Sequence, residues 1–332
     1  MAIESGKYPG VERTPVKHDP RRGPDGGTDR PPRVGIVTDE THSDLTDDGR
    51  AIAAALGTRG VDAEPFVWTD AVGPADGSDP SSPTDTATLE RYDALLFRSC
   101  WDYHADYERF RSFLDLLEAT TVEVYNPVDV VRWNCHKSYL TALAAAGVPT
   151  VPTACYAAGS DVSLDAELRD RGWGEAVVKP AVGAGSEGVW RTSTVDADGA
   201  RFDAELADRD LLLQRFVPAI ESGERSIVFV RGTYSHAWND LPQSDDFSAF
   251  GETGLSHRPS SDTVAAARDA LAAACRIVGR DPADLPYARV DYLDTDDGFA
   301  VMELELVEPD LEIGTAPAAA ERIADAVVAL AG

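Results

Sequence analysis

Residues 176–189 read AVVKPAVGAGSEGV, and Gly183, Gly185 and Gly188 within them form a literal G-x-G-x-x-G. This spacing occurs in dinucleotide-binding turns and in kinase phosphate loops, so the flanking residues must decide its meaning. The preceding stretch EAVVKPAV is rich in β-branched residues, and the following VWRTST alternates apolar and polar residues. Both patterns are typical of strands. The glycines are therefore predicted to join two strands.

Three phosphate-binding motifs do not fit this context. A dinucleotide fingerprint needs a helix after the glycines, because the pyrophosphate lies on the helix N-terminus. A kinase loop needs its lysine on the following strand, whereas Lys179 precedes the glycines here, and no H-R-D or D-F-G is present. A Walker A loop needs Lys-Ser/Thr after the last glycine. Two interpretations stay open: a loop whose backbone N–H groups face phosphates, and a flexible surface hairpin.

Lysine is rare in this chain. Only four of the 30 basic residues are lysines, namely Lys7, Lys17, Lys137 and Lys179. Because arginine supplies positive charge elsewhere, the two lysines outside the N-terminal segment are predicted to serve where a compact point charge is required.

A second informative stretch is ARVDYLDTDDGFAVMELELVEP at 288–309, which predicts a hairpin turning near Asp296 or Asp297. Period-2 alternation places Asp291 roughly opposite Glu303 and brings Arg289 and Glu305 to the same face. The other, buried face is predicted to hold Val290, Tyr292, Met302, Leu304 and Leu306. Clustered carboxylates repel one another, so the hairpin indicates a hard divalent cation bound beside a phosphate. The alternative is a solvated acidic face.

The pattern along the chain predicts two kinds of architecture. Strands and helices alternate from Arg33 to Pro127, which indicates a small parallel α/β sheet. Short strands at close spacing follow a helix predicted over 129–147, which indicates antiparallel α+β structure. Polar loops are expected at 73–87 and 240–259. The predicted divisions are a disordered leader (1–31), an N-terminal α/β domain (32–128), a lid subdomain (129–216) and a C-terminal subdomain with the metal site (217–332).

Composition narrows the functional classes. The net charge of −28 and pI near 4.4 argue against nucleic acid or anionic membranes as partners, and suggest a cytoplasm rich in salt, as in halophilic organisms. The first 31 residues lack the apolar core of a signal peptide, and no apolar run approaches the ~20 residues that span a bilayer. Cys100, Cys135, Cys155 and Cys275 are widely spaced, which favours a reducing compartment.

The order of these motifs resembles a known superfamily. Asn134 and Lys137 on a helix are followed by AAGVPTVPT, VVKP, the glycine loop, LLQRFV, GERSIVFV, ARVDYL and ELELVEP. This order resembles the ATP-grasp superfamily of ADP-forming carboxylate–amine ligases, which includes glutathione synthetase, D-alanine–D-alanine ligase and ribosomal-protein glutamate ligases. The stretch RSCWDYHADYERF at 98–110 further resembles a subgroup near the ligase that closes the cycloserine ring. The fold expected is an N-terminal parallel α/β domain and two α+β subdomains that clasp ATP.

The resemblance also implies roles for individual residues. Lys137 and Lys179 would contact the ATP phosphates, residues 183–188 would form the lid, and Arg289 would stabilise the transferring phosphoryl group. Asp291, Glu303 and Glu305 would hold one or two Mg²⁺, or Mn²⁺. The nucleotide-binding set would be Lys137, Lys179, Gly183, Gly185, Ser186, Gly188, Gln214, Arg215, Phe216, Val217, Glu221 for the ribose hydroxyls, and Glu224.

Two positions depart from the superfamily pattern. The metal pattern commonly reads E-x-N, whereas Glu305 occupies the third position and adds charge. Related sequences often carry a basic residue where Asn239 stands, and residues 240–254 contain none. His236 could substitute for it, although a histidine on a strand is more often packed or hydrogen-bonded.

The implied reaction is phosphoryl transfer from ATP to a carboxylate, followed by attack of an amine or similar nucleophile on the acyl phosphate. The small-molecule acceptor site is expected near Arg98, Trp101, Asp102 and Tyr103, which follow the end of a strand; packing of the domain junction is the alternative. Competing hypotheses are an ATP-binding module without ligase chemistry and an NAD(P)-dependent oxidoreductase. A homodimer is possible by analogy with relatives.

Overall fold

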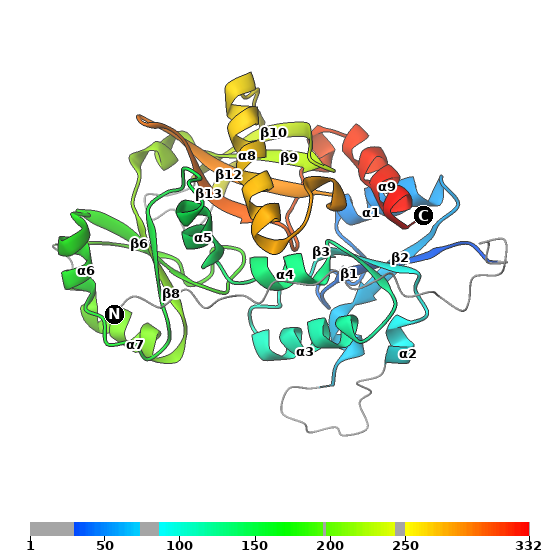
Figure 1. Ribbon diagram of the computed structural model, residues 1–332, viewed down its shortest axis with the longest axis horizontal. Helices are drawn as coiled ribbons and strands as arrows, with labels where there is room; N and C mark the ends of the chain where they lie inside the picture. Colours follow the sequence, from blue (N-terminus) through cyan, green and yellow to red (C-terminus); the bar gives the residue numbers. More distant parts are fainter. Residues whose placement is uncertain (1–29, 74–85, 195–196, 243–249, 332) are drawn as a thin grey trace. The chain divides into compact units, whose positions relative to one another are not determined.

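The computed structural model describes residues 30–73, 86–194, 197–242 and 250–331. Contacts divide the chain into Met1–Arg30 and Pro31–Gly332, and the account below concerns the second unit. Its elements form three sheets with helices packed on them (Figure 1). The predicted leader, most of the 73–87 loop and part of the 240–259 loop lie outside the described residues.

The first sheet is parallel and has the order β2-β1-β3-β4. This confirms the α/β arrangement that alternating strands and helices predicted before Pro127. Its inner strands are buried because helices cover the sheet, which explains the nearly continuous apolar runs RVGIVT and ALLF. Its elements are β1 (Arg33–Thr38), α1 (Asp47–Gly57), β2 (Asp62–Val67), α2 (Thr86–Leu89), β3 (Ala94–Ser99), α3 (Tyr107–Glu118) and β4 (Glu123–Tyr125).

The second sheet is antiparallel and has the order β5-β8-β6-β7. Two amphipathic helices pack on it through Leu164, Leu168, Phe202 and Leu206. The first of these helices has a signal at each end: Ser163 caps its N-terminus, and Gly172 ends it in the left-handed conformation. Its elements are β5 (Thr153–Tyr156), α6 (Leu164–Arg171), β6 (Glu175–Pro180), β7 (Trp190–Ser193), α7 (Gly199–Asp208) and β8 (Leu211–Arg215).

The third sheet is also antiparallel and has the order β11-β10-β9-β12-β13. One face packs on α4, α5 and α8, and the C-terminal helix α9 packs on α1 of the first sheet as well as on β9 (Figure 1). Its elements are β9 (Glu224–Val230), β10 (Thr233–Pro242), β11 (Phe250–Ser256), β12 (Ala288–Thr295) and β13 (Gly298–Glu305), with α4 (Val128–Asn134), α5 (Tyr139–Ala145), α8 (Ser261–Val278) and α9 (Ala318–Ala331).

The prediction and the structure differ at three places. The single helix expected over 129–147 is two helices, α4 and α5, separated by Cys135–Ser138. The loop expected over 240–259 includes the end of β10 and the whole of β11, which pair with each other. Helix α6 was not predicted, because its sequence LDAELRDR is mostly charged and presents only Leu164 and Leu168 to the core.

The predicted domain boundaries fall between the sheets, but α4 and α5, predicted in the lid subdomain, pack on the third sheet, and contacts join residues 31–332 into one compact unit. The division therefore stays a prediction.

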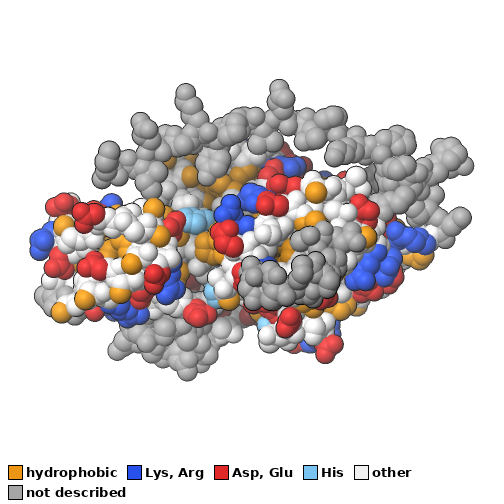
Figure 2. Space-filling view, turned by 90° about the horizontal axis from the view of Figure 1, so that it is seen from below, with side chains coloured by type: hydrophobic (Ala, Val, Ile, Leu, Met, Phe, Trp, Pro, Cys, Tyr) orange, Lys and Arg blue, Asp and Glu red, His pale blue; other side chains and the backbone are white. Residues whose placement is uncertain are grey.

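Acidic side chains are spread over the visible face rather than gathered in one region (Figure 2). No helix in the described residues is long and apolar enough to cross a membrane.

Candidate active site

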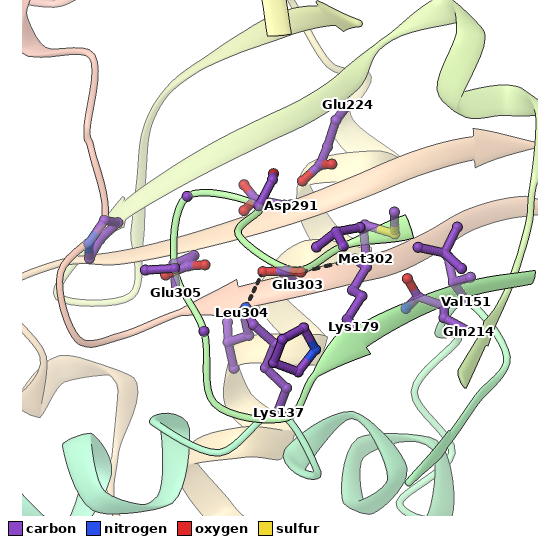
Figure 3. Close-up of a pocket in the computed structure, with 18 of the residues that line it drawn as sticks. Lys137, Val151, Lys179, Gln214, Glu224, Asp291, Met302, Glu303, Leu304 and Glu305 are labelled. Carbon is purple, nitrogen blue, oxygen red and sulfur yellow. Dashed lines mark hydrogen bonds and ion pairs between the residues drawn. The ribbon is translucent and has the colours of Figure 1, made fainter. Parts of the chain in front are cut away.

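The candidate site is a cavity of about 300 Å³ between the second and third sheets (Figure 3). β6 and β8 provide one wall, and the β12–β13 hairpin provides the other. The predicted site residues that line it are Trp101, Tyr103, Lys137, Lys179, Gly183, Gly185, Ser186, Gln214, Arg215, Phe216, Val217, Glu224, Arg289, Asp291, Glu303 and Glu305.

The acidic hairpin has the predicted register. Asp291 pairs with Glu303 and Arg289 pairs with Glu305, and the turn lies at Asp296–Asp297, between the two strands. Because successive side chains alternate, all four charged residues reach the cavity. This part of the site follows from the period-2 pattern.

One hairpin residue was placed on the wrong face. The register shifts between Asp291 and Tyr292, which pair with Glu303 and Val301, so Met302 has no partner. A bulge re-aims side chains in this way. Met302 consequently lines the cavity beside Val151, Phe216 and Leu293, while Val301 takes the buried position against Tyr292.

Glu303 joins the two lysines. Lys137 Nζ donates to Glu303 Oε2 at 2.5 Å, and Lys179 Nζ donates to Oε1 at 3.1 Å (Figure 3). Burial would raise the pKa of Glu303, but Lys137 and Lys179 outweigh it and hold that pKa well below its usual range. Burial likewise disfavours the Lys137 cation, yet Glu303 raises its pKa overall. Both lysine side chains thus converge on one carboxylate.

Lys137 lies in the break between α4 and α5 rather than on a helix as predicted. Its backbone N–H donates to the Ala181 carbonyl at 2.7 Å, which ties the break to the start of the glycine loop. Asn134, at the end of α4, fixes the hairpin from the same side: its amide donates to Leu304 O and accepts from Leu306 N. Tyr139 Oη accepts from Leu304 N. These contacts set the position of Glu303, the partner that both lysines share.

Asp291 is only 1 % exposed and is bound on two sides. Arg289 contacts both of its oxygens, with Nη2 to Oδ2 at 2.8 Å, and Ser226 Oγ donates to Oδ1 at 2.6 Å. Glu224 points toward Asp291 from β9 (Figure 3). Burial, followed by the negative charges of Asp291 and Glu303, raises the pKa of Glu224 to about 8. The four acids Glu224, Asp291, Glu303 and Glu305 thus outnumber the three cations Lys137, Lys179 and Arg289 in this part of the cavity.

The opposite end of the cavity is apolar. Val151, Phe216, Ile220 and Leu293 form a small cluster there, with Met302 packed against it. Gln214, at the end of β8, donates from Nε2 to Thr153 Oγ1 at 3.1 Å, and its buried Oε1 has no partner in the described part of the chain. A flat apolar ring with a hydrogen-bonding edge fits such a wall.

The glycine loop connects β6 to β7, which pair in antiparallel fashion. No helix follows the glycines, so the dinucleotide interpretation is wrong. Gly185, Ser186 and Gly188 have φ near +61°, +61° and +74°, a conformation that glycine adopts at low cost. Glu187 Oε2, in this loop, lies 3.1 Å from His104 Nε2.

Four predicted site residues do not line the cavity. Arg98 is buried and donates from Nη2 to Pro309 O, and Asp102 accepts from Trp68 Nε1. Gly188 lies against Pro180, and Glu221 is exposed in the 3-10 turn Pro218–Ser222. The contacts of Arg98 and Asp102 support the packing interpretation that the sequence left open for them.

His236 and Asn239 also lie away from the cavity. His236 Nε2 is 2.6 Å from Leu311 O, and its Nδ1 is 2.7 Å from Ser235 Oγ. Burial lowers the pKa of His236, which favours the neutral ring. Asn239 Nδ2 donates to Ser222 O at 3.2 Å. The packed, hydrogen-bonded state expected of most strand histidines is what the structure shows.

The cavity end near Trp101 contains residues that sequence reasoning did not single out. Glu308, Pro309 and Asp310 follow the hairpin and line this end. Glu308 lay within the quoted ELELVEP motif, but nothing in the local pattern indicates that its side chain is buried.

The four cysteines are free, as expected.

The carboxylates of the cavity are oxygen donors of the kind that a hard cation prefers, although they do not surround a common centre in this structure. In the described ranges, no three His, Cys, Asp or Glu side chains form a ready metal site, because lysines and Arg289 occupy the carboxylate oxygens. The acids offer oxygen donors only, and Glu224, Asp291, Glu303 and Glu305 outnumber the three cations that face them. Both properties fit Mg²⁺.

Two sheets that enclose paired lysines, an acidic hairpin and an apolar wall define an ATP-grasp ligase. Residues 34–126 match the family described as D-cycloserine synthetase DcsG, N-terminal domain. The cycloserine biosynthesis protein DcsG of Streptomyces lavendulae is 32% identical over 309 residues, which cover 89% of this chain and 97% of that protein. The chain therefore belongs to the D-cycloserine synthetase family of ATP-grasp ligases.

Solved structures agree with this assignment. The crystal structure of D-cycloserine synthetase DcsG is 29% identical, with a TM-score of 0.75 over 90% of this chain and 100% of that one. The D-alanine–D-alanine ligase of Bacillus anthracis, complexed with ATP, has a TM-score of 0.61 at 15% identity, covering 90% and 97% of the two chains, and shows likeness of fold. The ATP-grasp fold and an ATP-dependent, C–N bond-forming activity predicted from the sequence are confirmed.

Proposed function

We propose that this ligase transfers the γ-phosphoryl group of ATP to a small-molecule carboxylate and joins the acyl phosphate to an amine or similar nucleophile. The observation that carries the proposal is the convergence of Lys137 and Lys179 on Glu303, beside the Arg289–Asp291 pair. Two charged lysines at one point of a cavity form a site for a polyphosphate.

The cavity suggests how ATP lies. The adenine would contact Met302, Leu293 and Phe216, with its edge toward the backbone of residues 214–217. The lysines would exchange Glu303 for phosphate oxygens, and the glycine loop would close over them. Glu221 is exposed and outside the cavity lining, so its contact with the ribose stays a prediction.

Asp291, Glu303 and Glu305 are the proposed Mg²⁺ ligands, with Mn²⁺ as a possible substitute. A bound cation would supply charge neutralisation at the phosphates. Once the lysines have turned to the nucleotide, the Glu303 oxygens are free to accept a new partner. Glu305 stands where related ligases have asparagine, and its pKa is raised by burial and by the neighbouring acids, which fits a site that takes up added positive charge.

The chemistry then proceeds in two displacements. A carboxylate oxygen of the substrate attacks the γ-phosphorus, the bond to the β-γ bridging oxygen breaks, and ADP leaves. Arg289 would stabilise the transferring group. The nucleophile's lone pair then attacks the acyl carbon, phosphate leaves with the bonding electrons, and the nucleophile loses a proton. The protein positions the reactants and neutralises charge, so no nucleophilic side chain is required.

A screen of metabolite mixtures for ATP-to-ADP conversion at high salt tests this proposal, with the product identified by mass. Conversion should require Mg²⁺ or Mn²⁺. Lys179→Ala and Asp291→Asn should each lower turnover about 100-fold or more. Asp269→Asn, on the exposed side of α8, is the matched control. Wild-type activity in both site variants would contradict the assignment.

The product mass also separates two routes. The name of the Streptomyces relative points to cycloserine, so closure of a ring within one molecule is a candidate for this chain, beside condensation of two molecules. Saturable ATP binding without ADP formation across the panel would instead favour an ATP-binding module. A homodimer and a cytoplasmic location remain proposals from the sequence.

A further inference from the structure

Glu308 is the unusual acid of the cavity. Its side chain is 4 % exposed, and its Oε2 atom has no hydrogen-bond partner within the described residues. The other buried acids of this site differ: Glu303 has two lysines, and Asp291 has Arg289 and Ser226. Leaving a carboxylate oxygen buried without a partner costs free energy, so such a group calls for an explanation.

The position of Glu308 along the chain places it away from the nucleotide. Met302, Glu303, Glu305 and Glu308 all line the cavity, and Figure 3 shows Met302, Glu303 and Glu305 following one another along β13. β13 ends at Glu305, so Glu308 lies beyond the charged end of the strand, and Glu303 and Glu305 come between it and Met302 along the chain. Trp101, Tyr103 and Pro309 line the cavity with Glu308. This end is therefore free to hold the second reactant.

The backbone around Glu308 is held firmly. Trp101 Nε1 donates to Glu308 O at 2.7 Å, Arg98 Nη2 to Pro309 O at 2.8 Å, and Tyr287 Oη to Val307 O at 2.8 Å. Three donors on consecutive carbonyls leave the backbone little freedom. The backbone that carries the Glu308 side chain is thus preorganised, which is typical of residues that recognise a ligand.

The charges around the Glu308 side chain indicate which chemical group of a ligand would bind there. Burial, then the negative charge of Glu305, raises the pKa of Glu308 well above its usual range, and Lys137 and Arg289 offset this only in part. Those two cations are already paired with Glu303 and Asp291. A cation brought by the ligand would both pair with the Glu308 carboxylate and satisfy Oε2.

We propose that Glu308 binds an ammonium group of the substrate and selects molecules that carry one beyond the carboxylate to be phosphorylated. This inference rests on the proposed function in one respect: that function identifies the substrate carboxylate that is phosphorylated. It makes Glu308 a specificity-determining residue at the end of the cavity away from the adenine wall.

Binding measurements on the full chain test it without turnover. The protein is saturated with Mg²⁺ and a non-hydrolysable ATP analogue, and probes are titrated by calorimetry. The ammonium probes are methylammonium, ethanolamine, and both enantiomers of alanine and serine. The hydroxyl matches are methanol, ethylene glycol, lactate and glycerate, in which an uncharged hydroxyl replaces the ammonium group. The variants are Glu308→Gln, of the same shape, and Glu312→Gln, a nearby acid outside the cavity lining.

The wild type should bind at least one ammonium probe about tenfold or more tightly than its hydroxyl match. Glu308→Gln should lose that preference while keeping the affinity for the ATP analogue, and Glu312→Gln should keep both. Absence of any preference in the wild type, or an undiminished preference in Glu308→Gln, would overturn the proposal. Neither result depends on ADP formation, so failure here is distinct from failure of the proposed function.

Discussion

At the scale of single residues, the charged side chains of the cavity contact one another at the positions where the proposed function places ATP and Mg²⁺. Glu303 is shared by two lysines and Asp291 is clamped by Arg289, while Glu224 faces both acids (Figure 3). The sequence predicted which acids meet, because alternation and a turn fix a register. It did not predict that Glu303 would bridge the lysines, since that contact joins residues from three separate elements.

Glu224 gives the protein a predictable dependence of stability on pH. Its pKa rises from an ordinary 4.5 to about 8 on folding. Between these values the folded state holds a proton that the unfolded state does not, so this residue lowers stability as pH rises through that window. Glu224→Gln should therefore raise the melting temperature relative to wild type more at pH 8.5 than at pH 5.5. Scanning calorimetry at the two pH values measures it, with the exposed Glu221→Gln as control; equal shifts at both would refute it.

Secondary-structure elements show where local patterns stop being sufficient. Strands with clear alternation, such as β12 and β13, were predicted with their pairing. The break at Cys135–Ser138 was not, because helical periodicity continues through it, and the reason for the break is tertiary: the Lys137 N–H bonds to Ala181 O. The bulge at Met302 likewise has no signal in the sequence, and it moves that side chain from the core to the cavity.

The bulge makes Met302 an adenine contact in the proposed function. Met302→Ala should weaken ATP binding about five- to twentyfold, because apolar surface that the base would bury is lost. The thermal stability of the free protein should change little, since the side chain is not in the main core. Titration with a fluorescent ATP analogue measures the affinity, and Val328→Ala, a truncation on the exposed side of α9, is the control. Unchanged affinity would place the adenine elsewhere.

The whole molecule carries a net charge of −28 that is spread along the chain. Such a surface repels itself, and salt at about 1 M reduces the screening length to about 3 Å. We therefore predict that the melting temperature rises between about 0.1 M and about 2 M KCl. The rise should persist in Glu308→Gln, which removes only one of these charges. A fall in melting temperature with added KCl would contradict adaptation to a salt-rich cytoplasm.

The central claim, at the scale of the whole molecule, is that two sheets bring ATP and a carboxylate together so that an acyl phosphate forms. The most direct measurement uses a substrate found by the screen and labelled with ¹⁸O in its carboxylate. If the carboxylate is phosphorylated and the nucleophile then displaces phosphate, one ¹⁸O atom appears in each phosphate released. Formation of ADP with phosphate that contains no ¹⁸O would contradict the mechanism.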